Sequence, residues 1–214
     1  MTFFTKIGVN DKAYPKRVAN ALGESAPNIE VLGDVGLLER RSVIILSRRA
    51  PSLMQCRYLE HIGSIAGALE LGVISPIDNR KVLVYTAPRS CMVAGGVWCM
   101  VRNGAIRPSD LSLFGKNIAW DRFCIIGIET KRTDPPSRWL DKLRFSVAMS
   151  RAVILLSEDK EWIYRRFVSL IPKSIMVPTW VAGPESLGEV VHGHLVLSTI
   201  RDVRSRLIEV ARSD

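Results

Sequence analysis

The densest group of residues that could do chemistry lies between positions 129 and 144. It combines one indole with five cations, namely Trp139 with Lys131, Arg132, Arg138, Lys142 and Arg144. Cations neutralise the phosphates of a nucleic-acid backbone, and an indole stacks on an unpaired base. This mixture therefore favours single-stranded nucleic acid as a ligand. The alternative is that Trp139 packs in the core while the charges surround the solvated start of a helix.

A second group of anion-binding residues follows the first strongly apolar segment of the chain. Ser47, Arg48 and Arg49 stand between a predicted strand and a predicted helix. Backbone N–H groups at the start of a helix already attract anions, and guanidinium groups strengthen that attraction. Phosphate is the ligand that this junction would suit, although two arginines that only solvate a loop would have the same sequence.

Sequence patterns for catalysis and for metal binding are weak. Arg89 precedes Ser90 and Cys91, but the G-x-S-x-G pattern of a nucleophile turn is missing, so Arg89 is retained only as a further nucleic-acid contact. His192 and His194 have no neighbouring nucleophile pattern. No zinc-binding spacing and no glycine-rich phosphate loop occurs. We therefore expect a protein that is not an enzyme and has no metal or other cofactor.

Composition narrows the class of protein further. The chain has 214 residues, of which 47% are hydrophobic and 24% charged, as expected for one large globular domain. A net charge of +9 favours polyanionic partners. No apolar run of membrane-spanning length and no signal peptide is seen, and the four cysteines have no pairing pattern, so a cytoplasmic protein is expected.

The pattern of apolar residues predicts an α/β protein, with an extended Rossmann-like, mainly parallel sheet and helices on both faces. Strands are predicted at 42–46, 81–86, 96–101, 122–128, 153–156 and 174–177, and helices at 52–71, 139–150 and 160–170. Residues 1–38 form a turn-rich lead-in that packs on the core, and residues 39–214 form the main domain. Ligands of such sheets bind beyond the carboxyl ends of the strands, here in the predicted loops 47–51, 87–96, 102–110 and 129–139.

The order of these motifs resembles the DNA-processing protein A family, also called DprA or Smf. In the first half, the similar elements are Tyr14-Pro15, Gly33-Asp34, Leu37-Leu38 and an apolar strand ending in Leu46-Ser47-Arg48, where the family has Gly-Ser-Arg. In the second half they are Glu129, Asp134 to Pro136, Trp139, Lys142 to Arg144, Ser150 to Val153 and Val177-Pro178. The resemblance covers about residues 14 to 205 and depends on the order of short motifs.

The resemblance implies a protein that binds single-stranded DNA without catalysis, forms a homodimer and delivers the strand to a RecA-type recombinase in DNA uptake, transformation or recombination. Arg48 would hold a phosphate, and Lys142 with Arg144 would replace the family's basic pair. Two other functions stay open on the same scaffold. One is a nucleotide-binding sensor or nucleotide-processing enzyme, for which Gly95-Gly96 and Glu129 are the nearest pocket residues. The other is a degenerate interaction subunit.

Overall fold

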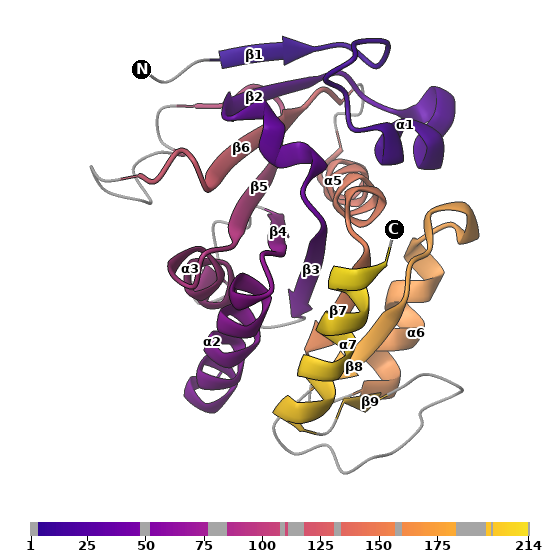
Figure 1. Cartoon of the computed structure of the whole chain (residues 1–214). Coiled ribbons are helices and arrows are strands. Elements are labelled where there is room, and N and C mark those ends of the chain that lie inside the picture. The colour runs from indigo at the N-terminus through magenta and orange to yellow at the C-terminus, as the bar shows by residue number, and fades with distance from the viewer. Residues whose placement is uncertain are drawn as a thin grey trace.

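One mixed sheet runs through the whole molecule (Figure 1). The computed structural model describes residues 4–47, 52–76, 85–107, 110, 118–130, 134–156, 160–182, 196–197 and 199–213. Within them, nine strands pair in the order β1-β2-β6-β5-β4-β3-β7-β8-β9. The strands are β1 (Phe4–Ile7), β2 (Ile29–Gly33), β3 (Ser42–Ser47), β4 (Gly72–Pro76), β5 (Val97–Asn103), β6 (Phe123–Ile128), β7 (Ala152–Leu156), β8 (Thr179–Ala182) and β9 (Val196–Leu197).

Strands β3 to β9 are parallel, whereas β2 pairs antiparallel with both β6 and β1. The helices are α1 (Lys16–Leu22), α2 (Leu53–Ala68), α3 (Thr86–Val93), α5 (Pro135–Met149), α6 (Lys160–Leu170) and α7 (Ile200–Arg212). Short 3-10 turns occupy η1 (Gly23–Ser25), η2 (Val35–Glu39) and η4 (Lys173–Ile175). In the described part of the chain, no helix combines the length and the apolar character needed to cross a membrane.

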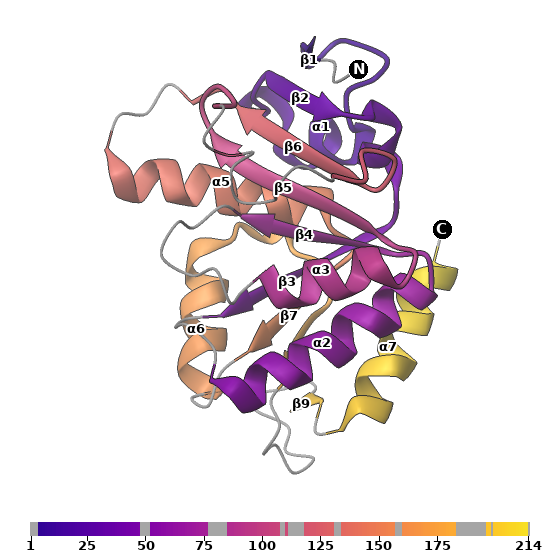
Figure 2. The ribbon, with the colours of Figure 1, turned by 90° about the vertical axis from the view of Figure 1, so that its left-hand side faces the viewer.

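Helices cover both faces of the sheet, as Figures 1 and 2 show. Helices α1, α5 and α6 pack on one face, and α2, α3 and α7 pack on the other. Strand β6 shows how the sequence fills both layers: Cys124 and Ile126 belong to the core on the α5 side, and Phe123 and Ile125 to the core on the opposite face. Side chains alternate in direction along a strand, so a continuously apolar strand is one buried on both faces. The predicted α/β, mainly parallel fold is confirmed.

The helix predicted at 52–71 has the expected start. Ser52 caps α2 by accepting a hydrogen bond from the backbone N–H of Gln55 (3.3 Å), and the Gln55 side chain accepts from the N–H of Ser52 (2.9 Å). This reciprocal capping box satisfies two N–H groups that have no partner inside the helix. Helix α2 ends at Ala68, and Glu70 then takes a positive φ of 57° that turns the chain towards β4.

The strand predicted at 81–86 is wrong where it can be compared. Residues 81–84 lie outside the described residues, and Thr86 begins α3. Strand β3 pairs instead with β7 and with β4, and β4 begins at Gly72, directly after the segment predicted as a helix. A Cβ at position 72 would overlap the Ser42 hydroxyl, so glycine is needed here because two strands pair closely.

Three further expectations are corrected. The strand predicted at 174–177 is wrong: η4 follows Pro172, and β8 begins only after Pro178, because proline interrupts regular backbone pairing. The predicted loop 87–96 is mostly α3. The first 38 residues, predicted as a turn-rich lead-in, contain β1, α1 and the buried strand β2, so the sheet begins before residue 39.

Helices α2 and α3 approach each other closely through two glycines of α2. A Cβ on Gly63 would overlap the carbonyl oxygen of Ala87, and a Cβ on Gly67 would overlap that of Cys91. Small residues at such a crossing let two helix backbones come into contact. The position of α3 on the sheet therefore depends on Gly63 and Gly67.

We predict that Gly63→Ala lowers the free energy of unfolding by about 1–3 kcal/mol, because the added methyl group forces the two helices apart. At an exposed helix position the same change would stabilise by about 1 kcal/mol, since alanine favours the helix. Urea denaturation measures the difference. The control is Ser64→Ala, on the exposed side of α2, which should change stability by less than about 0.5 kcal/mol. A stabilising Gly63→Ala would contradict the close contact.

Candidate nucleic-acid interface

The candidate site lies along the edge where the parallel strands end. Strand β3 ends at Ser47, β5 at Asn103 and β6 at Ile128, and Asn103 is in register with Ile128. In Figure 2 these strands point to the left, and the start of α5 extends beyond the same edge. The antiparallel β2 begins beside the end of β6, with Ile29 opposite Ile128, so residues that precede β2 also reach this edge.

Three arginines gather at the end of β5. Burial and the positive charges of Arg107 and Arg138 lower the pKa of Arg102, while the carboxylate of Glu30 raises it. The guanidinium group of Arg102 is thus close enough to be repelled by those of Arg107 and Arg138, and the three groups come from β5, the loop after it and the start of α5. Such a cluster is an electrostatic site for anions, and guanidinium groups match phosphate geometry well.

A single carboxylate holds two of these arginines. Asp110, which is 9% exposed, forms an ion pair with Arg102 and also accepts a hydrogen bond from the backbone N–H of Arg107 (2.7 Å). The side-chain amide of Asn103 donates to the carbonyl oxygen of Arg138 (2.7 Å). These contacts fix the loop after β5 against the start of α5.

The start of α5 follows from its local sequence. Asp134 caps the helix by accepting a hydrogen bond from the N–H of Ser137 (2.9 Å), and Pro135 and Pro136 occupy the first helical positions. Proline suits these positions because it has no N–H that needs a partner. Arg138 and Trp139 consequently lie near the N-terminal end of α5, where the helix dipole favours anions. The Trp139 side chain is 44% exposed, so it is not a core residue.

The residues predicted to bind nucleic acid differ in burial and in their place in the structure. Arg138 is half-buried beside Arg102, Ser47 is half-buried at the end of β3, and Arg89 is exposed on α3. Lys142 is only 8% exposed and makes a contact within the protein. Arg48, Arg49, Lys131 and Arg132 lie outside the described residues.

Arg144 lies in acidic surroundings. It is half-buried and lines a hollow of about 280 Å³ together with Glu24, Glu129 and Asp141. Asp141 accepts a hydrogen bond from the Thr130 hydroxyl (3.1 Å). Carboxylates around a cation reduce its attraction for phosphate. In its hollow Arg144 faces three carboxylates, whereas Arg102, Arg107 and Arg138 are three cations beside two carboxylates, Asp110 and Glu30, so these three arginines form the stronger anion site.

Arg102 and Arg107 were not singled out from sequence. The sequence indicated their place only indirectly, because residues 102–110 were predicted as a loop at the carboxyl edge of the sheet. Their grouping with Arg138 depends on Asp110 and Asn103, and no local pattern reveals those contacts.

A groove adjoins the arginine cluster. It has a volume of about 530 Å³ and is lined by Lys6, Ile7, Gly8, Asn28, Ile29, Glu30, Gly104, Ala105, Gly127, Glu129 and Thr130. Glu129 accepts a hydrogen bond from the Asn28 side chain (2.9 Å), and Glu30 accepts from the backbone N–H of Ile106 (3.0 Å). The residues after β5 therefore form part of the groove and also carry the arginines.

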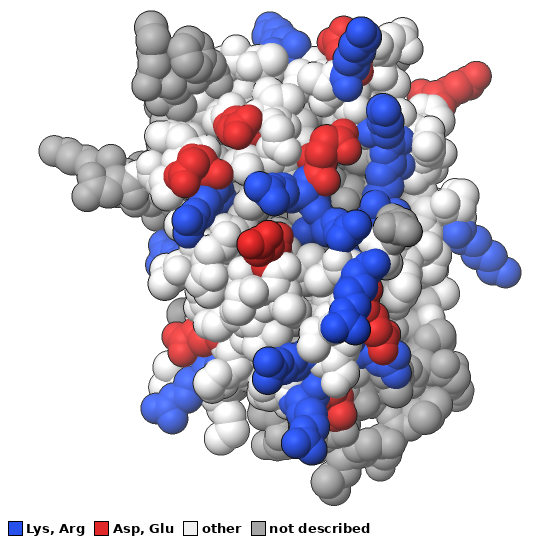
Figure 3. All heavy atoms as spheres, viewed as in Figure 1, with Lys and Arg blue, Asp and Glu red and all other residues white. Residues whose placement is uncertain are grey.

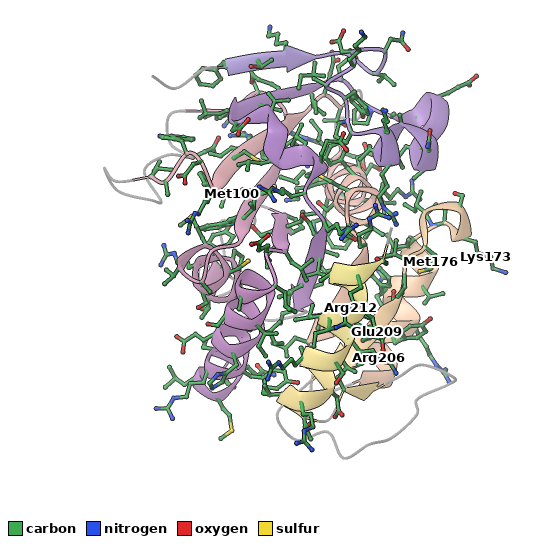
Figure 4. The ribbon with its side chains drawn as sticks, viewed as in Figure 1. Met100, Lys173, Met176, Arg206, Glu209 and Arg212 are labelled. Atoms are coloured by element: carbon green, nitrogen blue, oxygen red, sulfur yellow. The ribbon has the colours of Figure 1, made fainter. Side chains whose placement is uncertain are left out.

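Other cations have structural contacts at the opposite edge, the side that Figure 3 shows. Arg17 donates to the carbonyl oxygen of Ser150 (2.9 Å), at the end of α5, and Arg41 donates to that of Ala211, at the end of α7. On α7, Arg206 pairs with Glu209 (2.8 Å), as seen in Figure 4. Cations stabilise helix C-termini, so part of the net charge of +9 serves the fold.

The cysteines are all free and buried. Burial raises the pKa of Cys91 to about 12, and the sulfur atoms of Cys99 and Cys124 lie 3.4 Å apart in the core. Thiols of such high pKa are poor nucleophiles. Among the residues that the structure describes, no group of three or more His, Cys, Asp and Glu side chains could hold a metal ion. His192 and His194 lie outside them.

Fold and geometry together define an extended Rossmann-like α/β protein with a cationic carboxyl edge. Its fold is similar to that of DNA processing protein A from Helicobacter pylori, whose single-stranded DNA binding mode has been described: the TM-score is 0.68, the identity 15%, and 96% of each chain is covered. DprA from Streptococcus pneumoniae is also similar, with a TM-score of 0.61, 16% identity, and coverage of 96% of this chain and 69% of that chain.

The same scaffold occurs in a protein of another kind. The molybdenum cofactor carrier protein MCP from Chlamydomonas reinhardtii gives a TM-score of 0.50 and 12% identity, covering 82% of this chain and all of that chain. The chain matches no protein-family model and no curated protein. The resemblance to DprA that the motifs indicated is confirmed for the fold.

We predict that Asp110→Asn lowers the free energy of unfolding at pH 7 by about 1–3 kcal/mol, because it leaves Arg102 without its partner in a largely buried place. Both side chains of this pair are 12% exposed. The control is Asp121→Asn, which removes an exposed carboxylate 3.5 Å from Arg122 and should cost less than about 0.5 kcal/mol. Urea denaturation measures the free energy of unfolding of both variants. Equal effects would show that Asp110 does not hold the cluster together.

Proposed function

We propose that the chain is a non-enzymatic, DprA-type protein that binds single-stranded DNA along the carboxyl edge of its sheet. Arg102, Arg107 and Arg138 attract backbone phosphates, and Trp139 stacks on a base. The observation that supports this most strongly is the three-arginine cluster together with the 44% exposed indole of Trp139, the residue that follows Arg138 on α5. The fold likeness to a protein whose single-stranded DNA binding is described adds weight.

The exposed indole distinguishes single strands from duplex. In a duplex the faces of the bases are covered by their neighbours, whereas in a single strand a base is free to stack on an aromatic side chain. Phosphate contacts alone would bind both forms and would weaken steeply with salt. The proposed site thus predicts salt-sensitive binding that favours single strands.

Several parts of the proposal go beyond the described residues. Arg48, Arg49, Lys131 and Arg132 stay predicted contacts of the nucleic acid, on the strength of their residue types and their places in the sequence. A homodimer, delivery of the strand to a RecA-type recombinase and a cytoplasmic location stay predictions that come from the resemblance and from composition.

We predict different effects for Arg138→Gln and Trp139→Ala on the affinity for single-stranded DNA. Arg138→Gln should weaken binding at low salt by about three- to tenfold and reduce the slope of log affinity against log salt by about one, since one phosphate contact is lost. Trp139→Ala should weaken binding by about five- to a hundredfold with an unchanged slope, because stacking releases no counterions. Fluorescence anisotropy with labelled oligonucleotides across a salt series measures both.

The matched control for these variants is Arg122→Gln. Arg122 is exposed and directly precedes β6, at the opposite edge of the sheet. The substitution Arg122→Gln removes the same charge as Arg138→Gln. An equal loss of affinity in the two variants would therefore show that only the net charge of the protein matters. Unchanged affinity in both Arg138→Gln and Trp139→Ala would refute the proposed site.

The rival function is binding of a small nucleotide. The groove lined by Gly8, Gly104, Gly127 and Glu129 favours it, as does the likeness of the fold to a cofactor carrier protein. A mononucleotide added to the anisotropy assay separates the two functions. Displacement of the DNA by micromolar mononucleotide would support the rival, and displacement only by another oligonucleotide supports DNA binding.

A further inference from the structure

The groove beside the arginine cluster has the opposite electrostatic character. Glu30 and Glu129 are among its lining residues, together with the single cation Lys6. Phosphate groups would be repelled by the carboxylates, whereas a neutral group with N–H donors would be attracted. The groove therefore suits a part of the DNA other than its backbone.

Both carboxylates have an oxygen that can accept a further hydrogen bond. Oε2 of Glu129 accepts from Asn28, and Oε2 of Glu30 accepts from the backbone N–H of Ile106. Within the described residues, Oε1 of neither side chain accepts a hydrogen bond. Glu129 is exposed and Glu30 is half-buried. An ionised carboxylate is a strong acceptor and donates no hydrogen bond, so donors on the ligand decide what it binds.

The groove and the arginine cluster share one loop. Gly104 and Ala105 line the groove, the next residue, Ile106, donates to Glu30, and Arg102 and Arg107 flank this segment. The carboxylate of Glu30 also acts electrostatically on Arg102. Acceptors for one part of a nucleotide thus lie directly beside cations for its phosphates.

We propose that this groove is a base subsite that selects guanine over thymine in single-stranded DNA; the inference rests on the proposed function. Guanine presents its ring N1–H and its N2 amino group side by side, and together they can donate to a carboxylate. Thymine presents a single N3–H between two carbonyl oxygens, which the carboxylates would repel. Unpaired bases are read through these Watson–Crick edges.

The dimensions of the groove agree with this occupant. Its volume of about 530 Å³ lies within the usual range for small-molecule sites. Gly8, Gly104 and Gly127 leave parts of the wall without side chains, so a flat ring can approach the backbone closely.

The experiment compares three single-stranded oligonucleotides of about 20 nucleotides, longer than one binding site: oligo-dT, alternating d(GT) and alternating d(IT). Hypoxanthine, the base of inosine, keeps the N1–H of guanine but lacks the N2 amino group. We expect d(GT) to bind about tenfold more tightly than oligo-dT, which corresponds to one hydrogen bond to a charged acceptor, and d(IT) to bind with intermediate affinity.

The decisive variant is Glu129→Gln, an exposed position that should not disturb folding. It should reduce the preference for d(GT) to less than about threefold and raise the affinity for oligo-dT, because a negative charge that repels the thymine carbonyl oxygens is removed. The control is Glu24→Gln, an exposed residue of the neighbouring hollow, which should keep the preference. A circular dichroism spectrum verifies the fold of both variants.

The outcomes separate this inference from the proposed function. Equal affinity for all three oligonucleotides overturns base selection and leaves single-stranded DNA binding standing. A guanine preference that persists in Glu129→Gln overturns the assignment of the groove. If no oligonucleotide binds at all, the proposed function itself fails, and base selection with it.

Discussion

The parallel pairing of β3, β4, β5 and β6 is the constraint on which the candidate site depends. Parallel strands send the loops that follow them to the same edge of the sheet, and hydrogen bonding fixes how far each strand extends there. The register that places Asn103 beside Ile128 also places the loop after β5 beside the loop after β6. Because β2 runs antiparallel to β6, its beginning joins this edge, and Asn28 and Glu30 become part of the groove.

Charge at this edge is balanced rather than simply positive. Arg102 repels Arg107 and Arg138, and the ion pair with Asp110 together with the nearby Glu30 offsets part of that repulsion. The acidic side chains hold the loop in place without neutralising all three cations, which leaves attraction for phosphate. The carboxylate of Glu30 borders both the arginine cluster and the groove. This single residue therefore contributes to two neighbouring sites of opposite charge.

How far the sequence could predict this structure depends on how local each signal is. Strands β6 and β7 were predictable because they are short, continuously apolar segments, and α2 because Ser52 and its apolar spacing mark it. Strand β4 was missed because Gly72 is needed for contact with Ser42, a residue thirty positions away in the chain.

For the candidate site, too, the sequence predicted only the features that depend on neighbouring residues. The segment around Arg138 and Trp139 was predictable from the mixture of cations and indole. The burial of Lys142 was not, because it depends on how α5 docks on the sheet, where Leu143 and Phe145 enter the core. The grouping of Arg102 with Arg107 depends on one acid, Asp110, whose role is visible only in the folded chain.

The most direct test of the central claim is photochemical cross-linking to a single-stranded oligonucleotide that carries 5-iodouridine, followed by mass spectrometric mapping of the attached residues. Binding along the carboxyl edge predicts cross-links at Trp139 and in the peptide that contains Arg102 and Arg107, both lost when unlabelled single strands are added in excess. Cross-links confined to the opposite edge, around Arg17, Arg41 and Arg122, would contradict the account.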